Sequence, residues 1–244
     1  MRRRRFLLVI TSALALETIC WAGEMNAADF FKADSQRSLA EAAANGRTDQ
    51  LKMLLSKGAD INANGLQGMT ALYWALAHRS KSGVSWLLQH NANPNVLFAR
   101  DGTSATSLAA RLEDPWFLRE ILAHGGDLNI RNPINGRTPL AEAIAYGLDE
   151  NARILISAGA DMNTVDTTGL TPVLYAAANQ KYELVYDMLI AGADPTIQIA
   201  RSNGKTLLWV IGHSRVPPSA AAYQWQLKVI ELLKQRGLDV EHGQ

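Results

Sequence analysis

The chain has 244 residues, of which 48% are hydrophobic and 19% are charged, and its formal net charge is +1. This balance provides enough apolar side chains for a core, and it excludes both a disordered chain and a nucleic-acid-binding protein that relies on bulk positive charge. A single cysteine excludes a disulfide framework and a cysteine-rich metal site.

The first 22 residues have the pattern of a secretory signal peptide. Residues 2–5 are four arginines, residues 6–16 read FLLVITSALAL, and Glu17 ends this uncharged stretch. A basic start followed by an apolar segment shorter than the about 20 residues of a membrane-spanning helix is typical of a cleaved export signal. We therefore expect a periplasmic protein that is cleaved near Ala22, with Ala27 and Ala28 as alternative sites.

The leader also bears on the export route and on the charge of the mature chain. The arginine run fits the general secretory route and, as a weak match, the twin-arginine route. Residues 17–19 do not match a lipoprotein signal, so we do not expect a lipid on Cys20.

Removal of residues 1–22 leaves 20 basic and 22 acidic side chains, a net charge of −2, and no cysteine. A cysteine-free chain suits an oxidising compartment.

Three columns of residues recur along the chain, mostly with a period of 33 or 34. The first is a glycine or asparagine near the end of each unit, and its successive steps are 33, 34, 34, 33 and 45 residues. The second is a glycine two residues before a threonine or serine, and the third is alanine in five units. In order, the columns are Gly58, Asn91, Gly125, Gly159, Gly192 and Gly237; Gly68, Gly102, Gly136, Gly169 and Gly204; and Ala42, Ala75, Ala109, Ala143, Ala176 and Ile211. Columns in phase over this length indicate tandem structural repeats.

The unit resembles the ankyrin repeat. Residues 136–143 (GRTPLAEA) are similar to the start of that family's repeat, and residues 54–62 (LLSKGADIN) are similar to its end. The resemblance implies an all-α solenoid of about six helix-turn-helix repeats with short hairpin tips. We divide the chain into a signal peptide at 1–22, a lead-in at 23–34 and a repeat domain at 35–241, with repeats at 35–66, 67–99, 100–133, 134–166, 167–201 and 202–241.

Local chemistry within the repeats supports this division. Thr138 and Thr171 each precede a proline, which predicts a hydroxyl at the helix N-cap and proline at the first helical position. The alanine column predicts a close approach between neighbouring first helices, and the glycine column predicts the positive φ that ends each second helix. The last repeat is about twelve residues too long, and we place the surplus between its helices, near residues 215–222.

The sequence contains no recognisable catalytic or metal-binding motif. The five histidines do not have the spacing of a helical metal site, and neither a nucleophile elbow nor a phosphate-binding loop is present. We therefore expect a non-enzymatic protein with no cofactor and no metal. Among the tryptophans, Trp116 and Trp225 are the candidates for exposed anchors, whereas Trp74, Trp86 and Trp209 are expected to pack inside the repeats.

The family resemblance implies protein binding on a concave face built from hairpin tips and first helices. Leu66, Met69, Ile134 and Leu170 are apolar where exposed tips favour polar groups, and three arginines of consecutive repeats suggest an acidic partner surface. The matching positions are Leu66, Gln67, Met69, His78, Arg100, Asp101, Arg111, Ile134, Asn135, Arg137, Tyr146, Thr168 and Leu170, with Thr103, Thr167, Asn179, Asn203 and Lys205 beside them.

Three functions remain open from the sequence. The first is a periplasmic scaffold that protects or chaperones a protein partner, and the second is an immunity protein that neutralises a secreted antibacterial effector. The third, from a different class, is an enzyme that uses the insertion in the last repeat. We expect a monomer that binds neither nucleic acid nor, in its mature form, a membrane, and the genes adjacent to this one would separate the first two functions.

Overall fold

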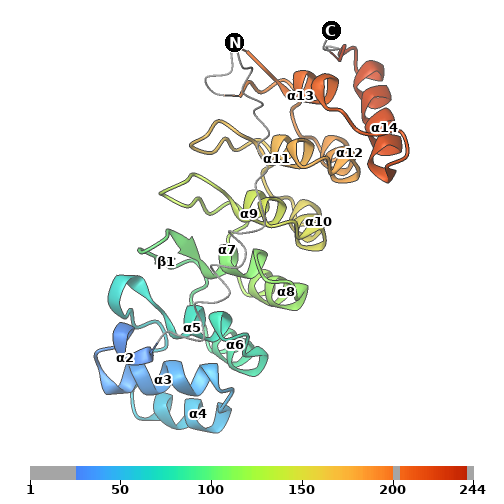
Figure 1. The fold of residues 1–244 in the computed structure, drawn as a ribbon. Helices are drawn as coiled ribbons and strands as arrows, with labels where there is room; N and C mark the ends of the chain where they lie inside the picture. The colour runs from blue at the N-terminus through green and yellow to red at the C-terminus, as the bar shows by residue number, and fades with distance from the viewer. Residues whose placement is uncertain (1–25, 200–203, 241–244) are drawn as a thin grey trace.

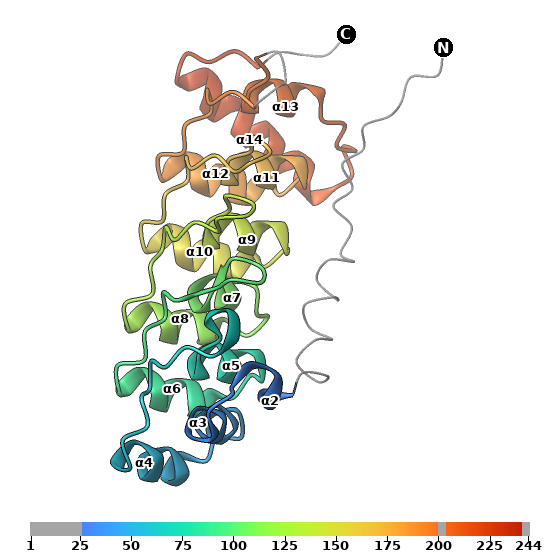
Figure 2. The same cartoon turned by 90° about the vertical axis from the view of Figure 1, so that its left-hand side faces the viewer.

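Six pairs of helices stack side by side in the residues that the structure, a computed structural model, describes, which are 26–199 and 204–240 (Figure 1). Figure 2 shows that the first helices and the second helices of the pairs form two rows along the stack. The inner row consists of α3 (Asp34–Ala44), α5 (Ala71–Ala77), α7 (Ala105–Ala110), α9 (Pro139–Ala145), α11 (Pro172–Ala178) and α13 (Leu207–His213). The outer row consists of α4 (Thr48–Ser56), α6 (Lys81–Gln89), α8 (Pro115–Ala123), α10 (Asp149–Ser157), α12 (Tyr182–Ile190) and α14 (Ala221–Gln235).

The alanine column lies where the inner helices meet. Each inner helix contacts the next along the row, from α3 with α5 to α11 with α13, and the outer helices contact one another in the same order. The column members Ala42, Ala75, Ala109, Ala143 and Ala176 are all buried. A methyl group at this position lets neighbouring helices approach closely, so one alanine per repeat sets the spacing of the inner row.

Of the two threonine caps predicted from the sequence, Thr138 forms its hydrogen bond and Thr171 does not. Thr70 and Thr138 accept a hydrogen bond from the backbone N–H three residues on, at the starts of α5 and α9. Asp114 caps α8 by accepting a hydrogen bond from the Trp116 backbone N–H, two residues on, with Pro115 at the first helical position. The Thr171 hydroxyl was expected to cap α11, but it is buried without a hydrogen-bond partner among the described residues.

The ends of the outer helices confirm the glycine column. The second residue after each outer helix has a positive φ, for example 84° at Gly125, and 65° at Asn91, where asparagine replaces glycine. This left-handed conformation is costly for most side chains and is best tolerated by glycine and asparagine. The column therefore marks where the chain must turn sharply out of each outer helix.

Asparagine rungs join the loops that follow successive outer helices. In four consecutive pairs of repeats, an asparagine Oδ1 accepts a hydrogen bond from a backbone N–H of the next loop, at 2.7–2.8 Å. The acceptors are Asn62, Asn95, Asn129 and Asn163, and the donors are the backbone N–H groups of Asn93, Asp127, Asp161 and Asp194. Each rung satisfies a loop N–H and fixes the offset between two repeats.

A short helix, α2 (Ala27–Phe30), packs against the start of the stack. Asn26 caps it by accepting a hydrogen bond from Ala28 N at 3.0 Å, and Phe30 and Phe31 are buried. The Phe31 ring lies edge-on to Trp74, with 5.9 Å between the ring centroids. Asn26 and α2 are thus part of the fold, and the expected cleavage site near Ala22 lies outside the described residues.

The last repeat differs from the others in its outer helix. The surplus residues are divided between a loop at 214–220 and a longer helix, since α14 has 15 residues where the other outer helices have 9. None of the helices in the described part of the chain is long and apolar enough to cross a membrane.

Candidate functional site

The hairpin tips that connect successive repeats form a continuous row beside the inner helices (Figure 1). They include the short 3₁₀ helix η1 (Leu66–Gly68) and an antiparallel pair of two-residue strands, β1 (Leu97–Phe98) and β2 (Thr103–Ser104). Hydrogen bonds join the tips to one another. Ala99 N donates to Gln67 O at 2.6 Å, Asn132 Nδ2 donates to Asp101 O at 2.8 Å, and Thr167 N donates to Asn135 O at 3.0 Å. The tips are therefore fixed relative to each other before any partner binds.

The four apolar tip residues do not share one environment. Ile134 is 61% exposed and Leu66 is 45% exposed, as expected, but Leu170 is only half-buried and Met69 is 0% exposed. The expectation that Met69 lies on the surface is wrong. It directly precedes the helix N-cap Thr70, and a residue at that position tends to pack against the first turn of the helix.

Arg111 is held by the next repeat instead of facing solvent. Its Nη2 donates to Thr103 Oγ1 at 3.1 Å, its Nη1 donates to the Tyr146 hydroxyl at 3.4 Å, and its guanidinium lies over the Tyr146 ring at 5.4 Å. Burial lowers the pKa of Arg111, but the nearby Glu142 carboxylate and further groups more than offset this, so the pKa stays above its ordinary value. The charged side chain therefore links the third repeat to the fourth.

Arg137 makes a second link, between the fourth and fifth repeats. Its Nε donates to the Tyr175 hydroxyl at 3.1 Å, and that hydroxyl donates to Asp166 Oδ2 at 2.5 Å. The guanidinium lies over the Tyr175 ring at 5.0 Å, and Arg137 Nε is 3.7 Å from Asp166 Oδ2. The arginine side chain is 22% exposed and the aspartate side chain 2%. The pair is thus largely removed from water.

Asp166 is the acidic residue of this link between Arg137 and Tyr175. Its Oδ1 accepts hydrogen bonds from Thr168 N, Thr168 Oγ1 and Leu170 N. Burial raises the pKa of Asp166, but the hydrogen bonds from Tyr175, Leu170 and Thr168 outweigh it, so the pKa lies below its ordinary value. The carboxylate is therefore charged, and its hydrogen bonds within the protein leave it unavailable to a partner.

These contacts correct the expectation of a basic cluster. Of the three arginines in the tip and inner-helix columns, Arg100 is exposed, and Arg111 and Arg137 are half-buried and bound to tyrosines of the following repeat. Glu142 is buried between them and accepts a hydrogen bond from Asn135 Nδ2 at 3.4 Å. The arginines stabilise the stack and leave little free charge in the hollow behind the tips.

The remaining inner-helix residues are also engaged. His78 Nδ1 lies 2.8 Å from Trp74 O, and Asn179 Nδ2 donates to Tyr175 O at 3.0 Å. His78 borders a shallow hollow of about 380 Å³ that is lined also by Asn26, Glu41, Ala27, Ala44, Asn45 and Trp74. Gln67, Thr167 and Thr168 are exposed on the tips, Asp101 is half-buried, and Asn203 lies outside the described residues. Lys205 Nζ lies 3.6 Å from the centroid of the Trp209 ring.

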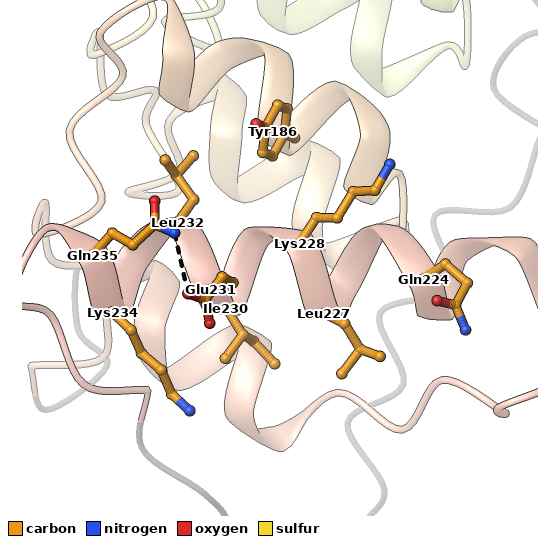
Figure 3. Close-up of a pocket in the computed structure, with 9 residues that line it drawn as sticks. All are labelled: Tyr186, Gln224, Leu227, Lys228, Ile230, Glu231, Leu232, Lys234 and Gln235. Atoms are coloured by element: carbon orange, nitrogen blue, oxygen red, sulfur yellow. Dashed lines mark hydrogen bonds between the residues drawn. The ribbon is translucent and has the colours of Figure 1, made fainter.

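Two further expectations concern other surfaces. Trp116 and Trp225 are half-buried and packed against the core, so their prediction as exposed anchors is wrong. A groove of about 510 Å³ runs along α14 beside Tyr186, and Figure 3 shows that polar side chains provide much of its lining. Within the described residues, no group of three or more His, Cys, Asp or Glu side chains is placed to hold a metal ion.

Stacked helix pairs with fixed hairpin tips define an ankyrin-type solenoid. Profiles described as ankyrin repeats in many copies and in three copies match residues 39–88 and 106–199. The chain belongs to the ankyrin repeat family, whose stacks are protein-binding scaffolds and are generally non-catalytic.

Similarity to curated proteins covers only part of each of them. Protein PhlB of Serratia liquefaciens is 37% identical over 147 residues, which are 60% of this chain and 64% of PhlB. The inactive serine/threonine-protein kinase TEX14 of Mus musculus is 32% identical over 120 residues, 49% of this chain and 8% of that protein. An L-asparaginase of Dirofilaria immitis is 27% identical over 157 residues, 64% of this chain and 26% of that protein. The chain spans less than two thirds of the length of each of these relatives.

Proposed function

We propose that the mature protein is a periplasmic, non-catalytic scaffold that binds one protein partner on the side of the stack formed by the tips and inner helices, in a protective or chaperone-like role. The observation that carries this proposal is a preformed row of tips with large apolar side chains exposed to water. Exposed apolar groups on a rigid frame favour protein binding because little conformational entropy is lost when the partner docks.

The outer helices also expose Met53, Ile190 and Leu227, but the outer face differs from the tip side in its charged groups. Ion pairs between neighbouring repeats occupy many of its charged groups: Lys81 with Asp114, Arg119 with Glu150, Lys181 with Asp149, and Arg153 with both Glu183 and Asp187. A partner that docked there would have to replace these contacts or accommodate them.

The test uses the absence of cysteine from the mature chain. A single cysteine in place of Leu66 on a tip, or of Met53 on α4, is coupled to a maleimide carrying a large polymer, and the two side chains are matched at 45% and 44% exposure. The labelled proteins are used to capture the partner from periplasmic extract, followed by titration with the purified partner. We expect the polymer on the tip to block binding and the polymer on α4 to leave it intact. The reverse result would place the partner on the outer face.

The identity of the captured protein separates the two roles left open by the sequence. A secreted effector as the partner would make the chain an immunity protein, whereas a resident periplasmic protein would support the protective role. Export is checked by the intact mass of the same material. We expect a mature N-terminus upstream of Asn26, because Asn26 caps α2, and a mass that retains Met1 would contradict the periplasmic location.

A further inference from the structure

The polar groups on the inner helices are unsuited to be the main anchors for a partner. Arg111 and Arg137 are bound to tyrosines of the next repeat, and Asn179 is bonded to a backbone carbonyl. A partner that used them would have to break part-buried hydrogen bonds that these groups already make, which offsets much of the gain from new ones. The binding groups that need no rearrangement are therefore those at the ends of the tips.

Ile134 is the most prominent of these groups. At 61% exposure it is the most exposed large apolar side chain among residues 26–199 and 204–240. The turn that carries it is fixed by Asn132, whose Oδ1 accepts from Ile134 N at 2.8 Å and from Asn135 N at 3.2 Å. The Gly136 N–H also donates to Asn132 O at 2.8 Å. An apolar side chain on so constrained a turn is already ordered for insertion into a pocket.

The charge of the tip segments, one of which carries Ile134, differs from that of the whole mature chain. Arg137 and Asp166 form a largely buried pair and offset each other, which leaves the exposed Arg100 and Arg131 and the half-buried Lys205 against the half-buried Asp101 in the described tip segments. The mature chain has a net charge of −2. The exposed edge of the tips therefore has a surplus of positive charge, which is complementary to carboxylates on a partner.

We propose that Ile134 is the anchor of the interface and inserts into an apolar pocket of the partner protein whose rim carries aspartate or glutamate side chains. This inference rests on the proposed function, since it specifies where the partner docks and what chemistry it presents. It differs from a general concave-face interaction because the contact is made by the tips and not by the inner helices behind them.

The test replaces single residues with the photo-crosslinking amino acid p-benzoylphenylalanine in the cells that make this protein. The probe stands at Ile134, at Ile190 on the end of α12 as a control of matched 58% exposure, and at Tyr146 on the inner row. We expect an adduct with one protein from position 134 and none from position 190. The crosslinked peptide, identified by mass spectrometry, should come from an apolar pocket with acidic residues at its edge.

Substitutions then measure the contribution of the anchor. Ile134→Asp should weaken binding of the purified partner at least about tenfold, as expected for an interface hot spot, whereas Ile134→Leu and Ile190→Asp should change it by less than about threefold. Adducts from 146 or 190 with none from 134 would overturn this inference and leave the proposed function standing. If none of the three positions gave an adduct, the proposed function would fail as well.

Discussion

The two long sides of the stack use ion pairs in opposite ways. On the outer side, the Arg153 and Asp187 side chains are 41% and 37% exposed and their charges meet in water. On the tip side, the Arg137 and Asp166 side chains are 22% and 2% exposed, and Tyr175 is bonded to both. Exposed pairs contribute about 0–1 kcal/mol, whereas breaking a buried, hydrogen-bonded pair leaves an uncompensated charge. The comparison predicts that the tip side depends on its ion pairs and the outer side does not.

Removal of the buried carboxylate should give the largest effect. Asp166→Ala leaves the Tyr175 hydroxyl and the Leu170 N–H without their acceptor and the charged Arg137 without its ion-pair partner, so we expect a loss of about 3–5 kcal/mol in the free energy of unfolding. Urea denaturation of both proteins measures this difference. A loss under 1 kcal/mol would mean that the buried ion pair of Arg137 and Asp166 stabilises the protein no more than an exposed pair does.

Packing along the inner row should be the next most sensitive feature. Ala143→Leu inserts a larger side chain where α9 meets α7 and α11, and overpacking of this kind costs about 1–3 kcal/mol. Ala123→Leu, at the exposed end of α8, is the matched control and should change stability by less than about 0.5 kcal/mol. Equal denaturation midpoints for the two variants would show that the alanine column is not at a close contact.

The acid side of the stability profile should report the same carboxylate. Because the pKa of Asp166 is lowered in the folded state, its contribution is complete above the ordinary aspartate pKa of about 3.9 and is lost as the pH falls through the lower folded value. Asp166→Asn should therefore flatten the acid-side loss of stability. Tyr175→Phe, which removes one hydrogen bond to the carboxylate, should move that loss to higher pH. Unfolding free energies between pH 7 and pH 2 provide the comparison, and three superimposable profiles would refute the assignment.

The smallest effect is expected on the outer side. Arg153→Gln removes ion pairs with Glu183 and Asp187 at 3.3 and 3.1 Å, yet the partners stay in water, so the cost should be at most about 1 kcal/mol. Added salt should reduce the difference from the unchanged protein because it screens exposed charges. A loss as large as that of Asp166→Ala would remove the distinction between the two sides.

The repeat architecture was predictable because it depends on local chemistry. Three features recur at fixed offsets: alanine at a close helix contact, a hydroxyl cap as at Thr70 and Thr138, and a residue of positive φ. The same pattern in successive repeats therefore supports the same local structure in each. The fold class and its family follow from these columns. Thr171 and Thr206 stand at N-cap positions without a cap hydrogen bond, which shows that a capping residue can be present without its bond.

The candidate site was less predictable because its character depends on contacts between repeats. Arg111 and Arg137 were read as free charges, but each is bonded to a tyrosine in the following repeat, 35 and 38 residues on. A search for arginine and tyrosine about one repeat apart is the sequence signal that would have found them. Met69 was misplaced for a simpler reason, since the tip column does not show that the residue before an N-cap turns inward.

The asparagine rungs have a consequence for how the gene can change. Each rung takes a side chain from one repeat and a backbone N–H from the next, so an internal repeat that is duplicated or deleted as a whole brings its acceptor and its donor with it. The fifth repeat breaks this rule, because Thr196 occupies the asparagine position and bonds within its own loop to Asp194. The regular asparagine pattern therefore ends at the fifth repeat in the described stack, and a copied repeat that contained the 15-residue α14 would not match the length of the others.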